Sequence, residues 1–123
     1  MTQQNLNNRT SLDELTKLVL DFREERDWKQ FHNPKDMALS LSLEAGEVLE
    51  LMQWRNGAEL DAHLKESRDP LGEELADVLG WILLLAHDQE IDLGEAFAKK
   101  IELNKQKYPI EKAKGSAKKW DQL

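Results

Sequence analysis

The sequence predicts an all-α fold, a four-helix bundle, and three observations lead to this prediction. Apolar residues recur every three or four positions over long stretches of the 123-residue chain. Helix-start signals, in which a capping residue is followed by a proline or by an acid three positions on, precede these stretches. No stretch alternates apolar and polar residues as a half-buried strand does. The length fits a single domain.

The first predicted helix begins at Ser11, where "SLDE" has the form of a capping box with Glu14 as its acid. Its apolar spacing fades after "REERD". Residues 27–34, "DWKQFHNP", show no period and are expected to form a loop. Asn33 then caps a second helix with a proline in its first position, where the missing N–H costs nothing. This helix should cover residues 34–55 and stop at "NG".

Residues 58–67 leave two alternatives open, a short exposed helix or part of a long loop. A third strong helix begins with "DP" at 69–70 and runs to residue 87 or 89. "DLGE" at 92–95 is another capping signal, and the fourth helix that it starts ends at "YP", residues 108–109.

The predicted organisation therefore has three parts. Residues 1–10 are polar and are expected to form a flexible leader. Residues 11–109 form the helical domain. Residues 110–123, "IEKAKGSAKKWDQL", are basic, contain Gly and Ser, and predict an irregular C-terminal tail.

The composition excludes several classes of protein. The chain has no cysteine, which excludes disulfide scaffolds, zinc–thiolate sites and thiol nucleophiles. A net charge of −7 disfavours binding to DNA or RNA polymers, although a bound metal reverses the local charge for a small phosphate ligand. No apolar segment is long enough to span a bilayer, and the polar start lacks a signal core. We expect a cytoplasmic protein that does not enter a membrane.

Two predicted helices each carry a pair of acids, three residues apart, beside an apolar stripe. These acids are Glu44 and Glu47 on one helix and Glu74 and Asp77 on the other. Removing a carboxylate from water is costly unless a partner compensates it. Cationic side chains are scarce on these faces, and protonation of several acids would need large pKa shifts. A bound divalent cation is simpler, and oxygen donors suit Mg²⁺, with Mn²⁺ as the alternative.

Other roles for these acids stay open at this point. A Glu-x-x-Glu pair on a helix is most often solvated surface. Neither pair ends in His, as a di-iron carboxylate bundle would require, so redox iron is the weaker alternative. Glu50 and Glu73 lie off the stripe; exposed acids are the expected role for them, and an outer metal ligand or a base is the alternative.

Aromatic and basic residues gather near these acids. The aromatic and imidazole side chains concerned are Trp28, Phe31, His32, Trp54 and Trp81. Beside a metal site they suit a flat base that stacks on aromatic faces, and a role in the core is the alternative. The fourth helix ends in lysines, including Lys107, which either compensate the helix dipole or meet phosphate oxygens.

Together these motifs resemble the MazG-like superfamily of all-α nucleotide pyrophosphohydrolases, and within it the short dCTP-pyrophosphatase-like branch. The superfamily pattern, Glu-x-x-Glu followed by Glu-x-x-Asp, corresponds to "EAGE" at 44–47 and to "EELAD" at 73–77. The resemblance covers residues 12–123. The branch-like segments are "FREERDWKQFHNP" at 22–34, "QW" at 53–54 and "NKQKYP" at 104–109.

The resemblance implies a house-cleaning enzyme that cleaves nucleoside triphosphates to monophosphate and pyrophosphate and favours deoxynucleotides such as dCTP. It implies Mg²⁺ held by the two acid pairs, and a homodimer or dimer of dimers with sites at subunit interfaces. On this basis the candidate substrate-binding residues are Trp28, Phe31, His32, Trp54, Trp81, Asn104, Lys107 and Tyr108. Relatives of this branch can carry Tyr in place of Trp81, so the base preference stays open.

Three competing functions remain at the sequence level. A nucleotide sensor without turnover is disfavoured because all four acids are present. A helical dimerisation module predicts that Ala at Glu44 or Glu74 stabilises the fold. A related hydrolase for phosphoribosyl-ATP or dUTP is disfavoured by the Trp-rich loop. For the enzyme, we expect direct attack by water, with Glu47 as the first candidate to orient or deprotonate it.

Overall fold

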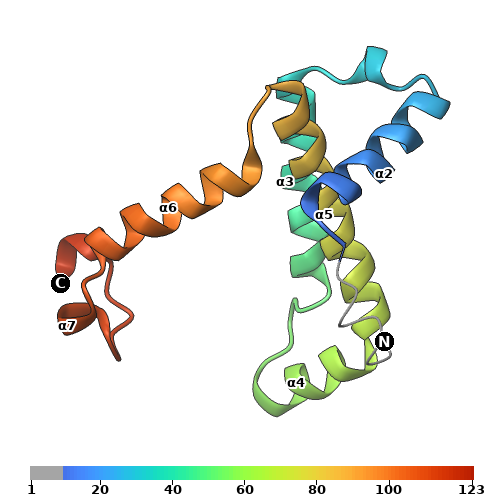
Figure 1. The fold of residues 1–123 in the computed structure, drawn as a ribbon. Helices are drawn as coiled ribbons and strands as arrows, with labels where there is room; N and C mark the ends of the chain where they lie inside the picture. The colour runs from blue at the N-terminus through green and yellow to red at the C-terminus, as the bar shows by residue number, and fades with distance from the viewer. Residues whose placement is uncertain (1–9) are drawn as a thin grey trace. The chain divides into compact units, whose positions relative to one another are not determined.

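The computed structural model describes residues 10–123, and every regular element in that stretch is helical (Figure 1). The all-α prediction is confirmed, since no strand occurs between residues 10 and 123. The predicted leader lies outside the described residues except for Thr10. No helix within residues 10–123 has both the length and the apolar character needed to cross a membrane. The elements are α2 (Leu12–Glu25), η1 (Lys29–Phe31), α3 (Pro34–Glu50), α4 (Gly57–Glu66), α5 (Arg68–Asp88), α6 (Leu93–Lys107), α7 (Ile110–Ala113) and η2 (Trp120–Gln122).

The capping box predicted at the start of α2 is confirmed. The Ser11 hydroxyl accepts the Glu14 backbone N–H at 3.2 Å, and the Glu14 carboxylate accepts the Ser11 backbone N–H at 3.4 Å. After the helix, Asp27 adopts the left-handed region with a φ of 52°. Trp28 then donates its backbone N–H to the Arg23 carbonyl at 3.1 Å. The predicted loop therefore leaves α2 through a tight turn that is anchored on the helix itself.

The start of α3 is as predicted, but its end is not. Asn33 caps the helix, because its side-chain oxygen accepts the Asp36 backbone N–H at 2.9 Å. The helix ends at Glu50, about one turn before the predicted residue 55. Trp54 closes the turn that follows with a φ of 69°, a backbone conformation that a right-handed helix does not contain. α4 then begins at Gly57, so the helical alternative for the next stretch is the correct one.

α5 follows α4 almost without a break. Only Ser67 separates the two helices, and its backbone N–H donates to the His63 carbonyl at 2.9 Å. The helix starts at Arg68, so the prediction that Asp69 caps it is wrong. Pro70 lies in the first turn, where backbone N–H groups have no helical partner, and it therefore leaves the helix intact.

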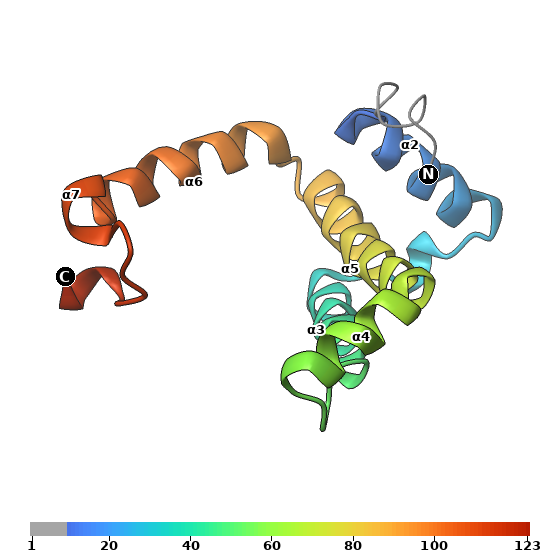
Figure 2. The ribbon, with the colours of Figure 1, turned by 90° about the horizontal axis from the view of Figure 1, so that it is seen from below.

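The chain forms two compact units that divide after Glu90, and three of the four main predicted helices, α2, α3 and α5, pack together in the first. α5 runs beside α3 and also contacts α2 (Figure 2). Met37 on α3 is only 1% exposed, and it is the most buried of the apolar side chains in the described residues. Large apolar side chains on α3, such as Leu39 and Leu43, stay exposed. The unit thus has a small core and a wide exposed apolar surface.

A buried ion pair joins α2 to α5. Arg23 is 4% exposed, and its two terminal nitrogens donate to the two carboxylate oxygens of Asp88 at 2.8 and 2.9 Å. These two charge-assisted hydrogen bonds replace the hydrogen bonds to water that the guanidinium loses on burial. The hydrogen bonds from Arg23 lower the pKa of Asp88, and they outweigh the opposing effect of burial.

The second unit contains the predicted fourth helix and the C-terminal segment. Asp92 caps α6 as predicted, since its carboxylate accepts the Glu95 backbone N–H at 3.0 Å. Residues 110–123, predicted to be irregular, contain the short helices α7 and η2. In this unit the Lys107 ammonium lies 5.4 Å from the centre of the Trp120 ring, a cation–π contact.

The ion pair predicts a large stability loss when one partner is removed. Asp88→Leu leaves the Arg23 charge buried and unpaired, and should lower the free energy of unfolding at pH 7 by about 3–5 kcal/mol. Because the folded-state pKa of Asp88 is lowered, its contribution is present above the unfolded pKa and is lost as pH falls through the folded pKa. Urea denaturation between pH 2 and pH 7 measures this loss.

Asp21→Leu is the matched control for this measurement. It removes the exposed pair between Lys17 and Asp21, whose charged atoms are 2.8 Å apart on the same helix. Surface pairs of this kind contribute about 0–1 kcal/mol. Equal losses in the two variants would contradict a special role for the buried pair.

Candidate metal centre and adjoining pocket

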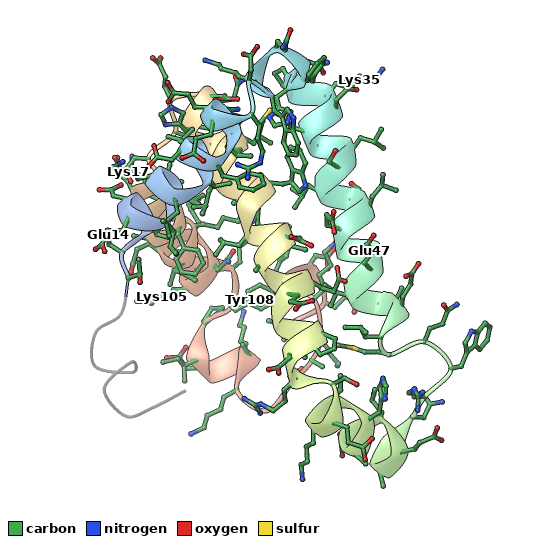
Figure 3. The ribbon with its side chains drawn as sticks, turned by 90° about the vertical axis from the view of Figure 1, so that its right-hand side faces the viewer. Glu14, Lys17, Lys35, Glu47, Lys105 and Tyr108 are labelled. Carbon is green, nitrogen blue, oxygen red and sulfur yellow. The ribbon has the colours of Figure 1, made fainter. Side chains whose placement is uncertain are left out.

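The four predicted acids meet where α3 and α5 run side by side. Each helix supplies two of them at a spacing of three residues, so that both members of a pair lie on one face. One carboxylate oxygen from each residue can be chosen so that all four lie within 4.8 Å of one another. Figure 3 shows Glu47 on α3, in the part of that helix that runs beside α5. The four residues are Glu44, Glu47, Glu74 and Asp77.

The cluster carries strong electrostatic repulsion. The pKa of Glu74 is raised to about 7, first by a hydrogen bond shared with Glu47, then by burial and by the nearby negative charges. The pKa of Glu44 is also raised, first by burial and then by a hydrogen bond with Glu47 and by the charges of Glu47 and Asp77. Glu47 thus raises the pKa of both half-buried acids.

The donor set fits a hard divalent cation. Within residues 10–123, none of the four acids forms an ion pair with a basic side chain. Arg55, which follows the turn after α3, contacts Glu59 at 3.5 Å. The buried Oε2 atoms of Glu44 and Glu74 have no hydrogen-bond partner. Four carboxylates, two of which have an unpartnered buried oxygen, form the kind of oxygen ligand set that Mg²⁺ or Mn²⁺ prefers.

A pocket of about 390 Å³ adjoins the cluster, because Asp77 belongs to both. Its size is in the range of small-molecule sites. Two helices and the loop between α2 and α3 form its walls, and three of the predicted substrate residues, Trp28, His32 and Trp81, face it together. The lining residues are Val19, Phe22, Arg23, Trp28, His32, Ala76, Asp77, Gly80, Trp81 and Leu84.

Aromatic contacts shape the walls of this pocket. The Phe22 and Trp28 rings meet edge to face with centroids 5.6 Å apart. The His32 ring meets Trp81 in the same way at 5.1 Å, and its Nδ1 is buried without a hydrogen-bond partner. Burial, followed by the positive charge of Arg23, lowers the pKa of His32, while Asp88 opposes this effect. The imidazole is therefore neutral at pH 7.

Five predicted substrate residues do not line this pocket. Phe31 and Trp54 belong to the first unit but are exposed, and Trp54 is 88% accessible. Asn104, Lys107 and Tyr108 belong to the second unit, where the Asn104 carbonyl accepts the Tyr108 backbone N–H at 2.8 Å. Their proposed contacts with substrate stay predictions.

Several residues that line the pocket were not predicted from the sequence, above all Arg23, Phe22 and Gly80. A signal for Arg23 existed, because it follows Val19 by one helical turn and continues the apolar stripe of α2. A charged residue in such a stripe indicates a buried partner, here Asp88. Gly80 gave no comparable signal, because the space beside it depends on Val19 from another helix.

The family model that matches this chain is described as the MazG-like family, and it covers residues 39–123. That range includes all four acids of the cluster. The chain belongs to the MazG-like family. The exposed acids Glu50 and Glu73 also lie in the matched range, but the cluster of this MazG-like chain does not include them.

Curated relatives and a solved structure also match part of the chain that precedes residue 39. dCTP pyrophosphatase 1 from Rattus norvegicus is 40% identical over 115 residues, which cover 92% of this chain and 68% of the relative. The Homo sapiens protein of the same name is 36% identical over the same shares. A crystal structure of a pyrophosphatase from Archaeoglobus fulgidus has a TM-score of 0.76 and 36% identity, and covers 83% of this chain and 95% of that one.

The acid cluster predicts that the metal-free protein loses stability as pH rises and that a divalent cation restores it. Because the pKa of Glu74 is raised, the folded state holds its proton more tightly than the unfolded state. The metal-free protein should therefore lose stability as pH rises from about 4.5 to about 7. Mg²⁺ or Mn²⁺ at one hundred times its Kd should add about 2.7 kcal/mol to the free energy of unfolding at pH 8.

Glu74→Gln should raise the metal-free Tm at pH 8 by a few degrees and remove most of the response to metal. Thermal unfolding with EDTA and with Mg²⁺ or Mn²⁺ measures both effects. The control is Glu73→Gln, which removes the same charge from an exposed neighbour outside the cluster. A full metal response in Glu74→Gln would contradict its role as a ligand.

Proposed function

We propose that this chain hydrolyses nucleoside triphosphates between the α and β phosphates, releasing the monophosphate and pyrophosphate, with deoxynucleotides such as dCTP favoured. The observation that carries the proposal is the junction of a four-carboxylate cluster with an aromatic pocket at Asp77. The names of the relatives, dCTP pyrophosphatase 1 and a pyrophosphatase, support the same reaction. A house-cleaning role in the cytoplasm, removing unwanted deoxynucleotides, follows as part of this proposal.

Glu44, Glu47, Glu74 and Asp77 would hold Mg²⁺, with Mn²⁺ as a substitute. When bound, the ion neutralises charge on the phosphates and lowers the pKa of a coordinated water. Glu47 orients the attacking water and accepts its proton, while the water oxygen bonds to phosphorus and the bridging P–O bond breaks. Its effect on the pKa of both Glu44 and Glu74 and its place within the cluster support this role.

The pocket receives the base of the nucleotide. A flat ring entering between α2 and α5 meets the aromatic faces of Trp28 and Trp81 and the imidazole of His32. Asp77 lines the pocket and also belongs to the acid cluster, so the phosphates of a nucleotide bound there would lie toward the residues that would hold the ion. Asn104, Lys107 and Tyr108 are further proposed substrate-binding residues, on the basis of the family resemblance.

The active form is proposed to be a homodimer or a dimer of dimers. Leu43 on α3 is 63% exposed, and Leu39 one turn before it is also exposed, which a second copy would cover. The backbone of Trp54 has a positive φ, a strained conformation for a residue with a large side chain, and its indole is exposed. A second copy that receives this side chain would explain both its display and its absence from the pocket of its own chain.

Product analysis tests the reaction. Purified protein is incubated with a panel of ribo- and deoxynucleoside triphosphates, with Mg²⁺, Mn²⁺ or EDTA, and the products are separated by ion exchange. We expect monophosphate and pyrophosphate only with metal, and the fastest turnover with dCTP or a related pyrimidine. Diphosphate with phosphate would contradict the proposed bond, and no turnover would favour a nucleotide sensor or a dimerisation module.

The same assay with Glu47→Gln links the reaction to the cluster. Loss of a positioned general base lowers kcat by about 10²–10⁴ at saturating metal. Glu50→Gln, an exposed acid on the same helix and outside the cluster, is the matched control and should keep its turnover. Near-full turnover of Glu47→Gln would assign the base role to another acid.

Filling the pocket predicts a separate effect on binding. A Cβ added at Gly80 would lie 4.0 Å from Val19 Cγ2, an ordinary contact, so Gly80→Ala should fold and retain activity. Gly80→Leu should extend into the space beside Trp81 and raise the KM for dCTP at least about tenfold, because the base no longer fits. Steady-state kinetics of both variants measure this, and equal KM values would place the base elsewhere.

A further inference from the structure

The Arg23–Asp88 ion pair lies at the wall of the proposed base pocket, and the reaction described above does not use it. Arg23 lines the pocket while both of its terminal nitrogens bind Asp88. A buried ion pair is a weak means of joining two helices, because apolar residues of similar volume do this as well or better. Its place beside the pocket therefore points to a role beyond joining α2 to α5.

His32 is the pocket residue that this pair influences most directly. Its buried Nδ1 has no hydrogen-bond partner, and its ring is held edge-on to Trp81. A buried polar nitrogen without a partner is costly. A ligand that brings a complementary polar edge into the pocket would supply the missing hydrogen bond.

The chain connects Arg23 to His32 through a short, hydrogen-bonded path. The Arg23 carbonyl accepts the Trp28 backbone N–H at 3.1 Å. The single turn of η1 follows, and the His32 backbone N–H donates to the Lys29 carbonyl at 2.9 Å. The loop that carries His32 is therefore hydrogen-bonded to the backbone of the residue whose side chain binds Asp88.

We propose that Arg23 and Asp88 are positioning residues of the pocket, which hold His32 so that Nδ1 meets the polar edge of a nucleobase and selects among bases. The inference rests on the proposed function, since it names what distinguishes one nucleotide from another at that site. The bidentate ion pair joins the α2 and α5 walls of the pocket. The ligand class is a planar base whose hydrogen-bonding edge pairs with a neutral imidazole.

The charges around His32 support this assignment. The positive charge of Arg23 lowers the pKa of His32 further than burial alone, and the carboxylate of Asp88 moderates the effect. A neutral imidazole offers one lone pair and one N–H, whereas an imidazolium offers two donors. When the proton of the neutral ring is on Nε2, Nδ1 is an acceptor, which pairs with an amino group as in cytosine but not with a carbonyl oxygen as in uracil.

The double variant Arg23→Met/Asp88→Leu tests the proposal, because it removes both charges and keeps the packing volume. We expect a folded protein whose KM for dCTP rises about tenfold, the loss of one hydrogen bond, while kcat changes less than about twofold. The ratio of kcat/KM for dCTP over dUTP should fall by a similar factor. The control is Lys17→Met/Asp21→Leu, which removes an exposed pair from the same helix and should change neither value.

The NMR titration of His32 gives a readout that a purely structural pair would not change. In protein labelled with ¹³C-histidine, with the His32 signal assigned by His32→Gln, the pKa should rise in the double variant. A folded double variant with unchanged KM, base selectivity and His32 pKa would overturn the proposal. If the double variant does not fold, Arg23→Lys is the second test, because lysine keeps the charge but cannot form two parallel hydrogen bonds to Asp88. The KM for dCTP should then rise. An unchanged KM would overturn the proposal.

Failure of the proposed function gives a different result. A wild-type protein that cleaves no triphosphate with Mg²⁺ or Mn²⁺ overturns the reaction but leaves the pocket to be tested by binding. A shift of the His32 signal on addition of dCTP, absent in the double variant, would then support the positioning role. No shift in the wild type would overturn it.

Discussion

Four carboxylates held within 4.8 Å of one another are the constraint around which this fold is built. Like charges at such distances repel, and this repulsion adds to the effects of burial and of hydrogen bonding to Glu47 that raise the pKa values of Glu44 and Glu74. The packing of α3 on α5 must therefore hold the acids together against their own charge. This is why the most apolar stretch of the chain, on α5, follows directly after its acid pair.

The sequence predicted the acid cluster well because helical geometry is rigid. Two acids three residues apart on a helix must share a face. Two such faces with apolar neighbours are expected to pack against each other in the core. The end of α3 was missed because it depends on the left-handed backbone of Trp54, which no local propensity favours for an indole. The start of α5 was missed because α4 continues into it through Ser67, which makes a capping residue at Asp69 unnecessary.

The pocket was only partly predictable for a different reason. Trp28, His32 and Trp81 were found because aromatic and imidazole side chains near acids suggest a base site. Arg23 was missed because a charge in "FREERD" resembles the polar end of a helix, and only the position of Asp88, 65 residues later, gives it a buried partner. The family match begins at residue 39, so the acid cluster and Trp81 lie inside it, whereas the loop with Trp28 and His32 lies outside it.

The position of each acid pair within a single helical turn has a consequence for how the chain tolerates change in length. Each helix carries both of its acids, so the segment between them, residues 51–67, contributes no carboxylate to the cluster. That segment can gain or lose residues while both acid pairs keep their internal spacing. One residue inserted between Glu44 and Glu47 instead turns one acid away from the other by about 100°. Insertions and deletions are therefore expected to be tolerated in residues 51–67, which connect the two helices. They are expected to be excluded from the residues between the two acids of each pair.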